Sequence, residues 1–193
     1  MLKKKKILTI LGILIAIFCL FLLFPKPNQI ETRLTNKNTE SFQSLINKDK
    51  YQVFVFDCSA YFPFNFARHP WFVLNKKGEV SRWEVRQERN KETGSHLYFN
   101  SQLPFQGLNL TYFIENYFWK VELLGFIEGD ENSVAQKMID FMEKSKETYP
   151  YTFEYSLTGP NSNTYLQWVL NKFPEFNIKL SWRFIGKDFK INK

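Results

Sequence analysis

The residues best suited to chemistry lie between Gly159 and Tyr165, where Gly-Pro-Asn-Ser-Asn-Thr-Tyr precedes an amphipathic stretch that ends at Phe173. A Gly-Pro pair fixes a turn, and Asn161 or Ser162 can cap the first N–H groups of a helix that starts there. The same helix start offers free N–H donors and a positive dipole end, which favour an anion or a developing oxyanion. The stretch therefore predicts either a capped helix start or a site with Ser162 as nucleophile.

A serine nucleophile needs a nearby base, and the base needs an orienting partner. The chain has two histidines, and one of them, His69, begins a strand-like run that a turn at residues 75–78 joins to a run containing Glu84. With a four-residue turn, His69 lies opposite Glu84, which would hold the imidazole in one tautomer. With a bulge in the turn, the register moves by one and Val85 faces His69 instead. The sequence leaves both registers open.

The second histidine, His96, follows Gly94 and Ser95 in a loop, where it can line a cleft or stay solvated. Trp71 lies two residues after His69 and can stack on a ligand or pack in the core. We therefore take Ser162, His69 and Glu84 as candidate catalytic residues. The candidates for binding a ligand or shaping the site are Asn161, Asn163, Thr164, Trp71 and His96.

Two cysteines are present, Cys19 and Cys58, and two cysteines fit no metal-site spacing, so we expect no metal and no cofactor. The net charge of +7 is concentrated at the amino terminus, where Lys3 to Lys6 contribute four of the positive charges. The remaining +3 is spread along the chain without a basic stripe, which argues against nucleic-acid binding.

An uninterrupted apolar run from Ile7 to Phe24 follows these lysines. About 18 helical residues cover roughly 27 Å, close to the hydrocarbon thickness of a bilayer. The alternative is a cleaved signal peptide, but no small-x-small cleavage pattern follows the run. We predict an uncleaved anchor in the inner membrane, with the amino terminus in the cytoplasm and the remainder outside.

The expected organisation is a basic tip at 1–6, an anchor at 7–24, a linker or peripheral segment at 25–50, an extracytoplasmic domain at 51–189 and a tail at 190–193. Strand-like and helix-like segments are mixed without regular alternation, which favours an α+β domain with a mainly antiparallel sheet and at least two packed helices. The expected strands are 51–56, 69–74, 80–86, 116–127 (one strand or two with a bend) and 151–157. The expected helices are 133–148 and 162–173, and 94–107 is expected to be irregular.

The stretch from Gly159 to Tyr165, with the helix that follows it, resembles the signature of an uncharacterised bacterial family, domain of unknown function 3750. Other segments match its landmarks in order: Ala67–Trp71, Trp83–Val85, His96–Leu97, Tyr149–Tyr151 and Ile185–Asp188. The resemblance covers about residues 51–189. It implies membership of the family and leaves the activity open.

A second resemblance concerns mechanism. Circularly permuted papain-like enzymes carry a strand histidine first and later an Asn-Cys-x-x-aromatic helix start. In this chain His69 precedes the run Asn161–Tyr165, and Ser162 stands where those enzymes have cysteine. The resemblance implies a papain-like fold and a hydrolase or acyltransferase acting on a cell-envelope substrate. A scaffold that binds an envelope ligand or a protein partner without cutting it is the alternative.

Overall fold

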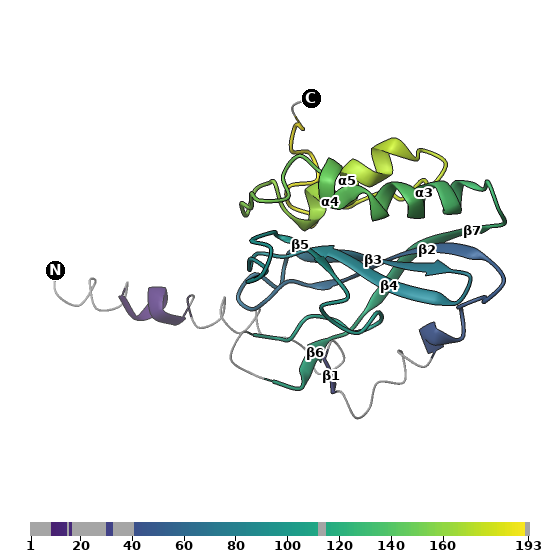
Figure 1. Cartoon of the computed structure of the whole chain (residues 1–193). Coiled ribbons are helices and arrows are strands. Elements are labelled where there is room, and N and C mark those ends of the chain that lie inside the picture. Colours follow the sequence, from purple (N-terminus) through teal and green to yellow (C-terminus); the bar gives the residue numbers. More distant parts are fainter. Residues whose placement is uncertain (1–8, 15, 17–29, 33–40, 112–114, 192–193) are drawn as a thin grey trace.

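The computed structural model describes residues 9–14, 16, 30–32, 41–111 and 115–191. Its centre is an antiparallel five-stranded sheet with the strand order β5–β4–β3–β2–β7 (Figure 1). The strands of this sheet are β2 (Tyr51–Ser59), β3 (Arg68–Lys76), β4 (Glu79–Val85), β5 (Leu97–Phe99) and β7 (Glu122–Gly129). The predicted α+β class with a mainly antiparallel sheet is therefore confirmed.

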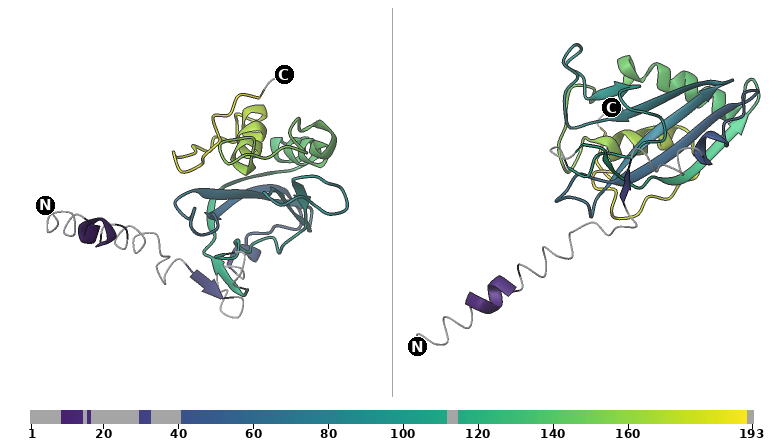
Figure 2. Two further views of the ribbon diagram at one scale, coloured as in Figure 1. Left: turned by 90° about the vertical axis from the view of Figure 1, so that its left-hand side faces the viewer. Right: turned by 90° about the horizontal axis from the view of Figure 1, so that it is seen from below.

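Three of the helices lie together on one face of the sheet, as two perpendicular views show (Figures 1 and 2). They are α3 (Val134–Glu143), α4 (Ser145–Thr148) and α5 (Ser162–Lys172). A small two-stranded sheet of β1 (Ile30–Thr32) and β6 (Tyr117–Trp119) lies on the opposite side. The central sheet is therefore covered on both faces.

Strand β2 shows why both faces are buried, because all nine of its residues are buried. Val53 and Val55 point into the core between the sheet and the helices. Phe54 and Phe56 point the other way, into a second core that includes Leu108 from the loops between β5 and β7. Alternate residues of a strand face opposite sides of the sheet, so the near-continuous apolar run of β2 supplies both cores.

The predicted helix after Gly129 is confirmed at its start. Ser133 is the N-cap of α3 and accepts a hydrogen bond from the backbone N–H of Gln136 at 3.2 Å. Met138, Ile139 and Met142 form the buried face, as helical spacing predicts. The helix ends at Glu143, and the rest of the predicted segment forms the short helix α4.

The β3–β4 hairpin is present, but both predicted registers are wrong. Lys76 pairs with Glu79, so the turn has two residues instead of four. Lys77 and Gly78 have φ angles of 50° and 98°, the left-handed values that a two-residue turn of the I′ type requires. Continuing this register sets position 86 opposite His69, two residues beyond Glu84.

Two other predictions of secondary structure, for 151–157 and 94–107, are wrong. The predicted strand at 151–157 is absent, and this segment consists of turns and irregular backbone in which Phe153 is exposed. Its Thr152 carbonyl accepts a hydrogen bond from His96 N–H at 2.8 Å, but this backbone contact does not extend into a ladder. The segment 94–107, expected to be irregular, contains β5. The segment 116–127 forms two strands, β6 and β7, the second of the alternatives predicted.

The predicted anchor at 7–24 lies mostly outside the described residues, as does Cys19. Within the described part of the chain, no helix is long and apolar enough to cross a bilayer. Residues 9–14 and 16 are helical. The membrane anchor therefore remains a prediction.

Candidate functional site

The site is built around the start of α5, where Asn161 is the N-cap. Its Oδ1 accepts hydrogen bonds from the backbone N–H groups of Asn163 at 3.0 Å and Thr164 at 3.2 Å. Thr164 Oγ1 in turn accepts a bond from Asn161 N–H at 3.2 Å, which completes a capping box. The cap therefore uses two of the N–H groups that were expected to bind an oxyanion. Among the described residues, the N–H of Ser162 has no acceptor.

Backbone carbonyls near the carboxyl end of the chain hold the start of α5 in place through hydrogen bonds. Thr164 Oγ1 donates a hydrogen bond to the Gly186 carbonyl at 2.8 Å, and both Asn161 and Asn163 donate side-chain bonds to the Ile185 carbonyl. Gly186 has a φ of 93°, and a Cβ added there would lie 2.5 Å from Asn161 Nδ2. Only glycine fits this close approach, which fixes the backbone that carries Ser162.

His69 and Glu84 interact although they are not opposite each other in the ladder. Nε2 of His69 lies 3.0 Å from Oε2 of Glu84, and both side chains are buried. In the observed register, Glu84 is the diagonal neighbour of His69 on the same face of the sheet, a distance that long side chains can span. The predicted partner was correct, and the geometry that joins the two residues differs from the one predicted.

Glu84 is held as a carboxylate by its surroundings. Burial would raise the pKa of Glu84, but the adjacent Arg82 charge and the hydrogen bond to His69 hold it well below its ordinary value. Arg82 Nη2 lies 2.9 Å from Glu84 Oε2, and Ser101 Oγ donates to Oε1 at 3.1 Å. A carboxylate can only accept, so Nε2 of His69 carries the proton and Nδ1 holds the lone pair when the ring is neutral.

The Arg82 side chain is held in place by residues that do not line the cavity where His69 lies. It donates to the backbone carbonyls of Leu103, at 2.9 Å, and Gln106. Its guanidinium also lies over the Trp71 ring, 4.2 Å from the ring centroid. The indole N–H of Trp71 is bonded to the Pro104 carbonyl at 2.8 Å, and the ring is almost fully buried. Trp71 therefore supports the charged network and does not line the cavity described next.

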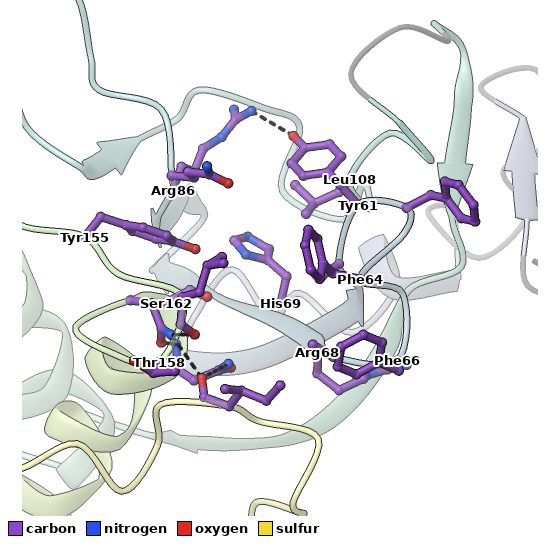
Figure 3. Close-up of a pocket in the computed structure, with 18 of the residues that line it drawn as sticks. Tyr61, Phe64, Phe66, Arg68, His69, Arg86, Leu108, Tyr155, Thr158 and Ser162 are labelled. Atoms are coloured by element: carbon purple, nitrogen blue, oxygen red, sulfur yellow. Dashed lines mark hydrogen bonds between the residues drawn. The ribbon is translucent and has the colours of Figure 1, made fainter. Parts of the chain in front are cut away.

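His69 and Ser162 line one cavity of about 480 Å³ at an end of the central sheet. Figure 3 shows His69 in the middle of the view, with Tyr155 and Ser162 on one side and Tyr61 and Phe64 on the other. Asn161 and Asn163 also line this cavity. The apolar and aromatic residues of its wall are Ala60, Tyr61, Phe62, Pro63, Phe64, Phe66, Ala67, Leu108, Tyr155, Leu157 and Ile185.

The reactive atoms of the two central candidates are not engaged elsewhere. Among the residues that the structure describes, neither Ser162 Oγ nor His69 Nδ1 has a hydrogen-bond partner. No hydrogen bond joins the two side chains directly. Both are nearly buried, with Ser162 5% and His69 7% exposed. A base that is oriented through one nitrogen and free at the other can accept a proton from a group bound in the cavity.

Tyr155 is a site residue that the sequence did not indicate. Its hydroxyl points into the cavity, toward the region between His69 and Ser162 (Figure 3). Burial raises the pKa of Tyr155 to about 12, so the hydroxyl stays protonated at neutral pH. Within the described chain this hydroxyl has no hydrogen-bond partner. A protonated phenol without a partner is a donor available to a ligand oxygen.

Two predicted residues have structural partners instead of a place on the cavity. His96 uses both ring nitrogens: Nδ1 bonds the Arg86 carbonyl at 2.9 Å, and Nε2 accepts from Arg89 Nε at 3.3 Å. Thr164 is fully buried and acts in the capping box and in the bond to Gly186. The structure therefore brings together Ser162, His69, Asn161 and Asn163 at the cavity, with Glu84 and Trp71 behind His69.

Cys58 lies beside His69 across the β2–β3 ladder. Its thiol is fully buried and is bonded to the Ser59 carbonyl at 3.3 Å, and burial raises its pKa to about 12. A buried neutral thiol is a poor nucleophile, so Ser162 remains the nucleophile candidate of this site. In the described part of the chain, no three His, Cys, Asp or Glu side chains are grouped so that they could hold a metal ion.

Comparison with known proteins gives one match. Residues 49–189 match the family model described as "Protein of unknown function (DUF3750)". The chain belongs to this family. The match contains every site residue described above, from Cys58 to Gly186, and confirms the family that the sequence resembles. No curated protein and no solved structure matches the chain significantly, and the papain-like resemblance stays a prediction.

Proposed function

We propose that this member of the DUF3750 family is a hydrolase or acyltransferase in which Ser162 is the nucleophile and His69 the base. The observation that carries the proposal is the orientation of His69. Its Nε2–H is directed to the buried carboxylate of Glu84 at 3.0 Å. Nδ1 has no partner among the described residues, and His69 lines the same cavity as Ser162. A nucleophile, a base and an orienting carboxylate are the parts that acyl transfer needs.

In this mechanism Ser162 Oγ forms a bond to the acyl carbon and gives its proton to His69 Nδ1. Glu84 stabilises the imidazolium that results, and the oxyanion accepts hydrogen bonds from Ser162 N–H and the Tyr155 hydroxyl. The tetrahedral intermediate then expels the leaving group, which takes the proton from His69. Water or a second nucleophile then attacks the acyl carbon of the acyl-enzyme and gives its proton to His69 Nδ1. The second tetrahedral intermediate expels Ser162 Oγ, which takes this proton back from His69, so that the acyl product is released and both residues return to their starting states.

The proposed location of the activity rests on the amino-terminal sequence. Four lysines precede the apolar run 7–24, a pattern that favours an amino terminus in the cytoplasm and a domain outside the inner membrane. We propose that the run anchors the protein in the bilayer and that the substrate belongs to the cell envelope. Amino-terminal sequencing of the purified protein tests this, because a chain that starts after Phe24 would have had its leader removed.

The missing bond between Ser162 and His69 favours a second candidate function, a domain that binds an envelope ligand in the same cavity without cutting it. Labelling of the full-length protein with a fluorophosphonate separates the two functions. The enzyme proposal predicts one adduct, mapped by mass spectrometry to Ser162 and absent from Ser162→Ala. No adduct on the folded wild-type protein, or equal labelling of Ser162→Ala, would leave the binding function.

A further inference from the structure

The wall of the cavity indicates which substrate class the proposed site takes. One side is the loop 60–67 between β2 and β3, which contributes Tyr61, Phe62, Phe64 and Phe66. Tyr155, Leu157, Ile185 and Leu108 also line the cavity. Binding of an apolar ligand to such a surface is favourable because apolar groups of the ligand are removed from water. The surface offers few directional contacts.

The charged residues of the wall are already paired. Arg68 bonds Asp57 through Nη2 at 2.7 Å and contacts Glu122 at 2.9 Å. Arg86 donates to the Tyr61 hydroxyl at 3.2 Å and lies 3.5 Å from Glu88. Neither guanidinium needs an anionic ligand for charge balance. The wall is therefore better suited to a neutral apolar group than to a phosphate, an acidic peptide or a polyanion.

Several polar groups of residues that line the cavity have no hydrogen-bond partner among the described residues. Besides Ser162 Oγ and His69 Nδ1, they include the Tyr155 hydroxyl and Asn163 Oδ1. Asn163 Oδ1 is buried and has no hydrogen bond in the described part of the chain, while its Nδ2 is fixed to the Ile185 carbonyl at 2.7 Å. A buried acceptor of this kind calls for a donor, which an N–H or O–H next to a substrate carbonyl would supply.

The mouth of the cavity is apolar as well. Three large side chains of the cavity lining are strongly exposed: Phe64 by 48%, Phe66 by 42% and Leu157 by 58%. The Phe64 and Phe66 rings are paired, with centroids 6.3 Å apart. Single exposed apolar residues are ordinary, but a group of them around one opening marks a place where an apolar ligand or surface is received.

From these observations we infer that the cavity holds the aliphatic chain of an acyl substrate, with the acyl carbonyl at Ser162. The inference rests on the proposed function for the position of the carbonyl, but the binding of the chain does not depend on catalysis. The chain comes either from a lipid of the bilayer or from a soluble acyl compound. The apolar wall, the paired arginines and the exposed mouth support both sources equally.

The test uses the full-length Ser162→Ala protein in phosphatidylglycerol vesicles, so that binding is measured without turnover. N-acylglycines with four to ten acyl carbons are titrated calorimetrically, with protein-free vesicles as the blank. They supply an N–H beside the carbonyl for Asn163. We expect the affinity to rise about fourfold for each added methylene until the cavity is full, because burying one methylene contributes about 0.8 kcal/mol.

A matched pair of variants tests whether the N-acylglycines bind in this cavity. Leu157→Asp puts a charge at the mouth of the cavity. It should weaken the binding of the longest N-acylglycine at least tenfold, which corresponds to about 1.4 kcal/mol of binding free energy. Phe153→Asp puts the same charge on a residue that is 60% exposed and does not line the cavity, and it should leave the affinity unchanged. Affinity that is independent of chain length, or equal loss in both variants, would overturn the inference.

A phospholipid with a photoactivatable acyl chain distinguishes the two sources. Crosslinks on Leu108 and Tyr155, inside the cavity, would show that the chain comes from the bilayer. Chain-length-dependent binding of N-acylglycines without these crosslinks would assign the cavity to a soluble acyl compound. The outcome is also separable from the proposed function: acyl binding by Ser162→Ala together with no fluorophosphonate adduct on the wild type would keep the acyl cavity and remove the catalysis.

Discussion

Oε2 of Glu84 lies 3.0 Å from Nε2 of His69, and the same oxygen lies 2.9 Å from Nη2 of Arg82. Glu84 therefore connects a histidine on the cavity to an arginine that is fully buried behind it. The ionised carboxylate selects the His69 tautomer that has its lone pair on Nδ1. Most of the predictions below follow from this connection.

The first prediction concerns Glu84→Gln. The amide keeps the size of the side chain and can accept from His69, but it cannot stabilise an imidazolium by charge. We expect the rate of fluorophosphonate labelling at Ser162 to fall by up to about 10⁴-fold, the loss that follows when the orienting carboxylate of a Ser-His-Asp triad is replaced by an amide. The rate is measured on protein shown by circular dichroism to be folded. A folded variant that is labelled at the wild-type rate would contradict the role of Glu84.

The second prediction concerns acid stability. The folded-state pKa of Glu84 is lowered below its ordinary value of 4.5, so the unfolded chain binds the proton more tightly than the folded chain. The stabilisation that ionised Glu84 provides is therefore complete above about pH 4.5 and is lost as the pH falls through the lower folded-state pKa. Glu84→Gln should be less stable than wild type at pH 7, and the difference should shrink below pH 4.

Urea unfolding at pH 7, 5, 4 and 3 measures this difference. At pH 7 we expect it to be about 3–5 kcal/mol, because the substitution leaves the buried charge of Arg82 without its partner. Glu143→Gln is the control, since Glu143 pairs with Lys76 on the surface and about 40% of each side chain is exposed. A gap between wild type and Glu84→Gln that stays constant from pH 7 down to pH 3 would show that folding does not lower the pKa of Glu84.

The third prediction concerns Tyr155, whose hydroxyl points into the cavity without a partner in the described residues. Tyr155→Phe removes one proposed oxyanion donor and should lower turnover of an acyl substrate by about 10²- to 10³-fold. Its stability to urea should stay close to that of wild type, because no described hydrogen bond is broken. Tyr149→Phe is the matched control, because the buried Tyr149 does not line the cavity. Unchanged turnover in Tyr155→Phe would remove the hydroxyl from the mechanism.

The fourth prediction separates two helix caps. Asn161→Ala and Ser133→Ala each remove an N-cap and should each cost about 1 kcal/mol of stability, with Asn161 toward 2 kcal/mol because it also holds the Ile185 carbonyl. Only Asn161→Ala should also slow the labelling of Ser162, because its cap sets the backbone of the site. Equal labelling rates in the two variants, measured where both are folded, would show that the cap does not position Ser162.

Much of this architecture could be predicted because it depends on local sequence. The helix caps at Ser133 and Asn161 and the positive φ at Gly78 follow from residue types at fixed spacing. The hairpin register did not follow, because a turn of two residues and a turn of four fit the same stretch around Lys77. The contact between His69 and Glu84 was nevertheless predicted correctly. It forms in the observed register because Glu84 lies on the same face of the sheet and reaches the His69 ring from a diagonal position.

What could not be predicted depends on tertiary packing. Alternating Phe153 and Tyr155 indicated a strand, yet the segment lies at the cavity without a ladder partner. Nothing local in the sequence shows that the Tyr155 hydroxyl faces His69. Local sequence was also misleading for His96, because its position in a loop suggested a place in a cleft. In the structure its two ring nitrogens bond Arg86 and Arg89.

The central claim is that His69 activates Ser162, and the rate of fluorophosphonate labelling at Ser162 tests it most directly. We compare His69→Asn with Glu143→Gln, because Glu143 pairs with Lys76 on the surface and does not line the cavity. His69→Asn should slow labelling by about 10²- to 10⁴-fold, the usual contribution of a general base, while folded Glu143→Gln keeps the wild-type rate. Labelling of Ser162 at the wild-type rate in folded His69→Asn would contradict the claim.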